Sequence, residues 1–105
     1  MSLLAAIALV AVTADPRVEL LNAQRAGDLR GALVAAERFA ADDPERSRAL
    51  GLSLLRGHLL ARLGRLPEAA AAFAAALGET PDLEPWARLR LAETEEALGH
   101  PEVAA

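Results

Sequence analysis

Cysteine, lysine and tyrosine are absent from this sequence of 105 residues, and aromatic side chains make up only 3% of it. Without cysteine there is no disulfide framework, and thiolate metal ligation and cysteine catalysis are excluded. No stretch alternates between apolar and polar residues as a half-buried strand does. Alanine and leucine make up about a quarter and about a fifth of the chain, and both favour helices. The sequence therefore predicts one small all-α domain with a core of leucine and alanine.

An excess of positive charge is also missing, because the formal net charge is −4 at neutral pH. A nucleic acid as main partner would require a basic surface, so this balance argues against it. The charge is unevenly distributed: residues 45–65 carry five arginines against one acid, and residues 79–102 carry seven acids against two arginines. Helices of opposite sign either attract one another within the fold or present this gradient to a partner.

Residues 1–14 form an apolar leader without a charged side chain. The run is too short to cross a bilayer, which needs about 20 apolar residues. It has the size of the hydrophobic region of a secretory signal, and Val12, Thr13 and Ala14 supply small residues before a cleavage at Asp15. We therefore expect a signal peptide, export to the periplasm or cell envelope, and no membrane span in the mature chain. The alternative is a first core helix in a cytoplasmic protein.

Regular helix start and stop signals follow Asp15. Starts are marked by Asp or Thr before a helix or by Pro at its first position, and stops are marked by Gly. The predicted helices span residues 16–26, 29–41, 44–63, 67–77 and 81–98 or 85–98, with a further start at Pro101. Because the loops are short, neighbouring helices are expected to be antiparallel.

The helix pairs recur in the sequence. When Gly27, Gly64 and Gly99 are aligned, the intervals are 37 and 35 residues. An alanine lies five residues after each glycine, and Pro44 and Pro81 lie seventeen residues after the first two. A helix–turn–helix unit that recurs at this length is typical of a solenoid.

The segment 50–83 resembles the tetratricopeptide repeat, on the positions Gly57, Gly64, Ala69, Phe73, Ala76 and Pro81. The resemblance implies a short right-handed α-solenoid over residues 15–105, with two repeats and the start of a third, continuing beyond the chain end. Gly57 and Ala69 would let the paired helices approach closely, and Phe73 would fill the space between repeats. The chain departs from the family at Ser53 and Arg56, where larger apolar residues are usual.

No arrangement of residues in the sequence predicts an active site. His58 and His100 are far apart, and neither has a second ligand at metal-binding spacing. The serines lack a nucleophile-elbow context, and the glutamates of residues 93–96 are expected to lie on a solvated helix face. We therefore expect a non-enzymatic protein that uses neither a metal nor another cofactor.

The resemblance further implies a partner-binding groove, lined by the first helix of each repeat. The matching positions are Arg17, Leu21, Gln24 and Arg25 in the first copy, and Leu54, His58 and Arg62 in the second. Three arginines and one histidine suit an acidic protein or peptide ligand. The Lys–Asn pair of the family's carboxylate clamp is absent, and the alternative is that these are solvated side chains.

The expected function is a non-catalytic scaffold for protein–protein interaction, exported to the cell envelope. The alternative is the N-terminal helical superhelix of an exported cell-wall enzyme such as a soluble lytic transglycosylase, which the segment 85–105 is similar to in style. Because about three repeats are needed to bury their apolar faces, we also expect the chain alone to be marginally stable, or to form a homodimer through residues 84–98.

Overall fold

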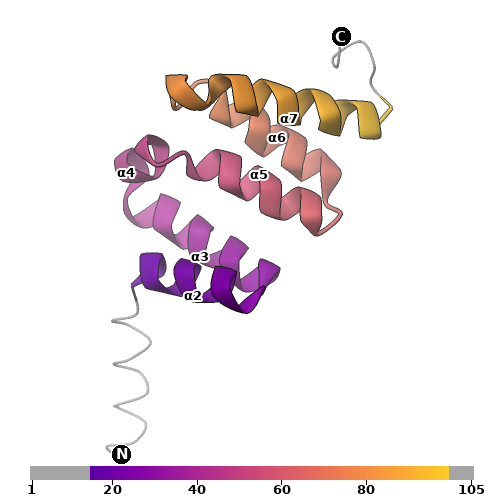
Figure 1. Cartoon of the computed structure of the whole chain (residues 1–105). Coiled ribbons are helices and arrows are strands. Elements are labelled where there is room, and N and C mark those ends of the chain that lie inside the picture. The colour runs from indigo at the N-terminus through magenta and orange to yellow at the C-terminus, as the bar shows by residue number, and fades with distance from the viewer. Residues whose placement is uncertain (1–14, 100–105) are drawn as a thin grey trace, which may run out of the picture.

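The computed structural model describes residues 15–99, and this part of the chain is entirely helical (Figure 1). The elements are α2 (Pro16–Ala26), α3 (Leu29–Asp42), α4 (Pro44–Ala49), α5 (Leu52–Arg62), α6 (Leu66–Ala76), the 3₁₀ helix η1 (Pro81–Leu83) and α7 (Glu84–Ala97). The prediction of an all-α fold is confirmed. The predicted leader, residues 1–14, and the predicted start at Pro101 lie outside the described residues.

Most helices begin and end at the residues that the capping signals indicate. Asp15, Asp28 and Asp43 each accept a hydrogen bond of 2.9–3.2 Å from a backbone N–H in the first turn of the helix that follows. Gly27 and Gly64 have φ values of 71° and 79°, the left-handed conformation that closes a helix and is costly for other residues. These two glycines separate α2 from α3 and α5 from α6.

The predicted single helix over residues 44–63 is wrong, because the chain leaves the helical path at Leu50 and Gly51 and forms α4 and α5 instead. Gly51 has a φ of 70°, which an α-helix cannot contain. A Cβ atom on Gly51 would lie 2.3 Å from Cδ1 of Leu83, so the side chain of η1 occupies the space that this glycine leaves. The Thr80 hydroxyl also donates a hydrogen bond to the carbonyl of Arg48. The corner between α4 and α5 is thus fixed by the segment that precedes α7.

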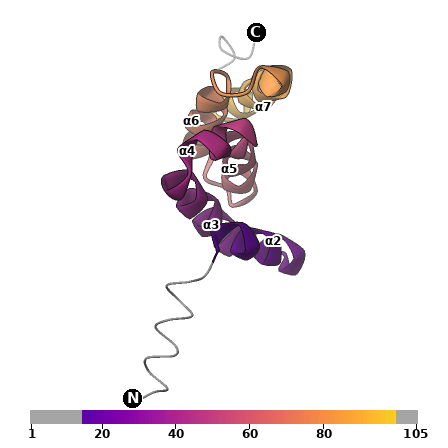
Figure 2. The ribbon, with the colours of Figure 1, turned by 90° about the vertical axis from the view of Figure 1, so that its left-hand side faces the viewer.

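The helices pack mainly in chain order: α2 on α3, α3 on α5, α5 on α6 and α6 on α7. Two views at right angles place them in two layers, with α2, α5 and α7 on one side and α3 and α6 on the other (Figures 1 and 2). Apart from the short helix α4, successive helices therefore alternate between the two layers (Figure 2). The result is a stack of helices with sequential, antiparallel-like packing.

The core consists mostly of alanine and leucine, as predicted, with Phe39 and Phe73 as its aromatic members. Phe73 is 1% exposed, and a Cβ atom on Gly57 would lie 2.5 Å from its ring. The expected close approach of α5 and α6 at Gly57 is therefore present. Phe73, which was expected between repeats, instead packs against Gly57 inside this helix pair, and it also borders the hollow between α5 and α7.

Helix α7 contacts α6 through one narrow stripe, in which Ala87 and Thr94 are buried and Leu91 is partly buried. The Thr94 hydroxyl donates to the carbonyl of Arg90, which satisfies it within the helix. Among residues 15–99, no helix combines the length and the apolar character that crossing a membrane requires.

Candidate partner-binding face

Three side chains of α5, Leu54, His58 and Arg62, follow one another at intervals of four residues and therefore share one face of the helix. We call these residues the α5 strip. Leu54 is partly buried, and His58 and Arg62 are exposed. The strip faces the layer's two other helices, with α2 on one side and α7 on the other, and it borders three adjoining hollows. His58 borders all three, so it lies at the centre of this surface.

The hollow on the side of α2 has a volume of about 160 Å³ and brings Gln24 next to His58 and Arg62. Asp28 also borders it, but this carboxylate accepts the backbone N–H of Gly31 and serves as the cap of α3. Of the four groove positions that the sequence predicts in the first copy, Gln24 is therefore the one that lies beside the α5 strip.

A larger and more apolar hollow of about 340 Å³ lies between α5 and the first half of α7. Its apolar lining consists of Leu50, Leu54, Leu55, Phe73, Leu83 and Trp86. His58 and Arg90 border it as well. Leu50 and Trp86, at 57% each, are among the most exposed large apolar side chains of the described residues. We call this cavity the α5–α7 hollow.

The third hollow, of about 300 Å³, continues along α5 and the second half of α7 and is bordered by His58, Arg62, Arg90 and Glu93. Arg90 Nη1 lies 3.1 Å from Glu93 Oε1, so these two charges are paired. Arg62 forms no ion pair with any residue in the described part of the chain. The face thus presents an unpaired guanidinium beside a histidine, in a chain whose net charge is negative.

Sequence reasoning missed Leu50, Trp86 and Arg90 as members of this face. Leu50 falls inside the continuous helix predicted over residues 44–63, and the predicted groove includes no residue of α7. A signal was available, since Trp86 is the only tryptophan and lies on a helix rich in charged residues. A large aromatic side chain in such a helix is frequently an interaction residue.

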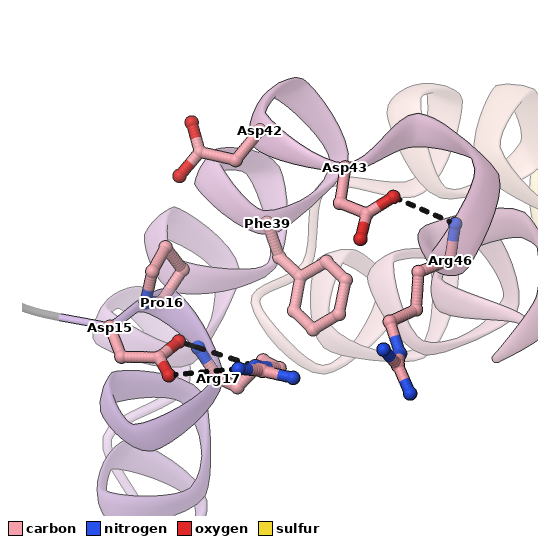
Figure 3. A pocket seen from close by; sticks show the side chains of 7 residues that line it. All are labelled: Asp15, Pro16, Arg17, Phe39, Asp42, Asp43 and Arg46. Carbon is pink, nitrogen blue, oxygen red and sulfur yellow. Dashed lines mark hydrogen bonds and ion pairs between the residues drawn. The ribbon is translucent and has the colours of Figure 1, made fainter.

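Arg17 lies apart from the α5 strip, at a separate pocket of about 380 Å³ between α2, α3 and α4 (Figure 3). Its guanidinium Nη2 is 3.2 Å from Asp15 Oδ2. The side-chain and backbone hydrogen bonds from Arg17 hold the pKa of the Asp15 carboxyl group below its ordinary value. Asp43, which also lines this pocket, caps α4. These carboxylates therefore serve as helix caps, and a lowered pKa is the opposite of what a general acid needs.

Leu21 and Arg25, the other two predicted groove positions, are exposed on α2 and border none of the hollows described above. The structure therefore brings together Gln24, Leu54, His58 and Arg62 and leaves Arg17, Leu21 and Arg25 outside this cluster. Within residues 15–99, no three histidine or carboxylate side chains converge as they would to hold a metal ion.

Comparison with known proteins gives no relative. No protein-family model matches this chain, no curated protein is similar to it, and no solved structure matches its fold.

Proposed function

We propose that this chain is a non-catalytic protein-interaction module of tetratricopeptide type, which binds a segment of a partner protein across the α2–α5–α7 layer. The observation that carries the proposal is the α5 strip, with its three adjoining hollows centred on His58. A surface that combines apolar hollows with a few exposed polar groups provides both the contact area and the orientation that binding a peptide segment requires.

Three features support the tetratricopeptide-type repeat: two helix pairs with a left-handed glycine at each turn, the close contact of Gly57 with Phe73, and the two layers of helices (Figure 2). On this interpretation α2–α3 and α5–α6 are two repeats of a short solenoid, and α7 is the first helix of a third. The layer formed by α2, α5 and α7 is then its inner face.

The test is a selection of twelve-residue peptides from a random display library on the full chain, with binding measured by fluorescence anisotropy. We expect selected peptides to bind the wild type and to bind Arg62→Glu at least tenfold more weakly. The matched control is Arg30→Glu, since Arg30 is also exposed and without an ion pair in the described residues but lies on α3, in the other layer. It should change binding less than twofold. A selection without enrichment, or peptides indifferent to Arg62→Glu, would contradict the proposal.

We also propose that the protein is exported, with residues 1–14 as its signal. The proposal follows from the apolar leader and the small residues at 12–14. The mass of the protein isolated from its own cells tests it, because cleavage before Asp15 removes the mass of those fourteen residues. A chain that retains residues 1–14 would contradict export by this route.

A further inference from the structure

We propose that the α5–α7 hollow is an anchor pocket, which takes an apolar side chain of an acidic peptide segment. The inference rests on the proposed function and adds the chemistry of the partner: an aliphatic or aromatic anchor residue, with carboxylates on the same side of the segment.

The apolar half of the proposal comes from the exposed side chains around the hollow. Leu50 and Trp86 are each 57% exposed and line the hollow from different elements, one from the end of α4 and one from α7. The volume of about 340 Å³ is sufficient for one side chain of a partner. Insertion of such a side chain would remove both residues from water, and buried tryptophan contacts are among those that contribute most to binding.

The part of the lining contributed by Phe73, Leu83 and Gly51 is preformed, which reduces the cost of ordering it on binding. Phe73 is 1% exposed and held against Gly57. Leu83 lies over Gly51, and the Thr80 hydroxyl bonds to the carbonyl at the end of α4. The parts of the hollow that come from α4, α5 and η1 are therefore already fixed to one another.

The acidic half of the proposal comes from the charges beside the hollow. His58 and Arg90 border it, and Arg62 follows His58 by one turn of α5. Glu93 neutralises Arg90, whereas Arg62 has no ion pair within the described residues. A carboxylate from the partner would form a charge-assisted hydrogen bond with the free guanidinium. A basic segment would instead meet Arg62, and the two acids that border the same hollows are engaged, Glu93 with Arg90 and Asp28 as the cap of α3.

The geometry of α5 sets the spacing in the partner segment. From Leu54 to Arg62 the chain takes eight residue steps, which advance about 12 Å along the helix axis, with His58 midway. An extended peptide advances about 3.3 Å per residue, and its alternate side chains point to the same side. When such a peptide runs along α5 with its anchor beside Leu54, carboxylates at the second and fourth residues from the anchor lie level with His58 and Arg62.

The experiment uses three synthetic eleven-residue peptides with a central phenylalanine. The residues two and four positions away on both sides are glutamate in the first peptide, lysine in the second and glutamine in the third, so either chain direction is covered. Because Trp86 is the only tryptophan of the chain and lines the hollow, its fluorescence reports binding directly. We expect the glutamate peptide to change this fluorescence saturably and to bind at least tenfold more tightly than the lysine peptide. Replacing its phenylalanine with alanine should weaken binding at least tenfold.

Two substitutions at one position separate charge from contact area. Leu50→Glu and Leu50→Arg remove the same apolar side chain. We expect Leu50→Glu to weaken binding of the glutamate peptide at least tenfold, and Leu50→Arg to weaken it less than threefold. Val34→Glu is the matched control, because Val34 is also 57% exposed and lies on α3. It should leave binding unchanged.

Several outcomes would overturn the anchor pocket: no saturable fluorescence change with the glutamate peptide, equal or tighter binding of the lysine peptide, or no effect of the phenylalanine. A dimer in sedimentation equilibrium that Leu50→Glu converts to a monomer would also overturn it, by making a second copy the occupant. If binding of the display-selected peptides is weakened by Arg62→Glu but unchanged by Leu50→Glu, the proposed function stands and the anchor pocket does not. If no peptide depends on Arg62, both fail.

Discussion

The helix pairs α2–α3 and α5–α6 fill the space between their helices in opposite ways. Counted from the left-handed glycines, Leu20 of the first pair corresponds to Gly57 of the second, and Ala36 corresponds to Phe73. The first pair thus places its large residue on the first helix and its small residue on the second, and the second pair reverses this order. All four positions are buried. We infer that the pairs share a similar combined side-chain volume at these two positions, because close packing constrains volume more strongly than the identity of either residue.

The two pairs also differ in how their helices begin. In the first pair, Asp15 and Asp28 cap α2 and α3 through side-chain hydrogen bonds. In the second pair, Gly51 and Arg65 stand at the corresponding helix starts, and neither provides a side-chain cap. Contacts from the segment before α7 hold the start of α5 instead, through Leu83. The first pair is therefore defined by local signals and the second by tertiary contacts.

Removing the large residue of the second pair should have the largest effect. We expect Phe73→Ala to lower the free energy of unfolding by about 3–5 kcal/mol, because it leaves a cavity over Gly57 that no neighbouring side chain fills. Urea denaturation followed by circular dichroism measures this directly. A loss below about 1 kcal/mol would mean that α5 and α6 collapse onto one another and that the volume between the two helices of a pair is not constrained.

Transferring the arrangement of the first pair to the second tests the comparison itself. Gly57→Leu alone should cost about 1–3 kcal/mol, because the new side chain meets the ring of Phe73. Combined with Phe73→Ala, it reproduces the order of sizes found in Leu20 and Ala36. The double variant should therefore lose about 1–2 kcal/mol less unfolding free energy than the sum of the losses in the two single variants. Simple additivity in the same urea experiment would show that the two positions do not compensate for each other.

Most of the fold could be predicted because most of its signals are local. The caps at Asp15, Asp28 and Asp43 and the stops at Gly27 and Gly64 depend on a few neighbouring residues, and all five act as expected. The break between α4 and α5 could not be predicted in the same way. It is fixed by contacts from residues 80–83, about thirty positions along the chain, and a glycine inside a helical pattern costs only about 1 kcal/mol.

The candidate face was predicted where it lies on one helix and missed where it spans several. Leu54, His58 and Arg62 follow from helical spacing alone. Leu50 and Trp86 join them only because the break before α5 and the crossing of α7 bring both to the same hollow. Arg17 was predicted from the register of the repeat, but its guanidinium pairs with the cap residue Asp15.

The caps provide a smaller test of the difference between the pairs. Asp28→Ala should lower the free energy of unfolding by about 1 kcal/mol, because the N–H of Gly31 loses its acceptor at 2.9 Å. Arg65→Ala, at the corresponding position of the second pair, should cost much less, because Arg65 contributes an exposed ion pair with Glu68 and no cap. Thermal unfolding of both variants under one set of conditions gives the comparison. Equal losses would mean that the start of α6 depends on Arg65 as α3 depends on Asp28.

The smallest expected effect is on the pH dependence of stability, where the two pairs should behave alike. Hydrogen bonds from Arg17 lower the pKa of Asp15, and a hydrogen bond from Arg65 lowers the pKa of Glu68. A carboxyl group whose pKa is lower in the folded state stabilises that state above its unfolded pKa of about 4, and this contribution disappears as the pH falls through the folded value.

The variant Asp15→Asn tests this contribution, because it keeps an acceptor at the cap but removes the charge. The stability difference between wild type and Asp15→Asn should therefore be present at pH 6 and shrink as the pH falls below about 4, and Glu68→Gln should follow the same course. Because both ion pairs are exposed, added salt should reduce both differences. A difference that does not shrink with falling pH would mean that the carboxyl group acts through its shape or its hydrogen bonds, whereas a difference for only one variant would make the charge specific to one helix pair.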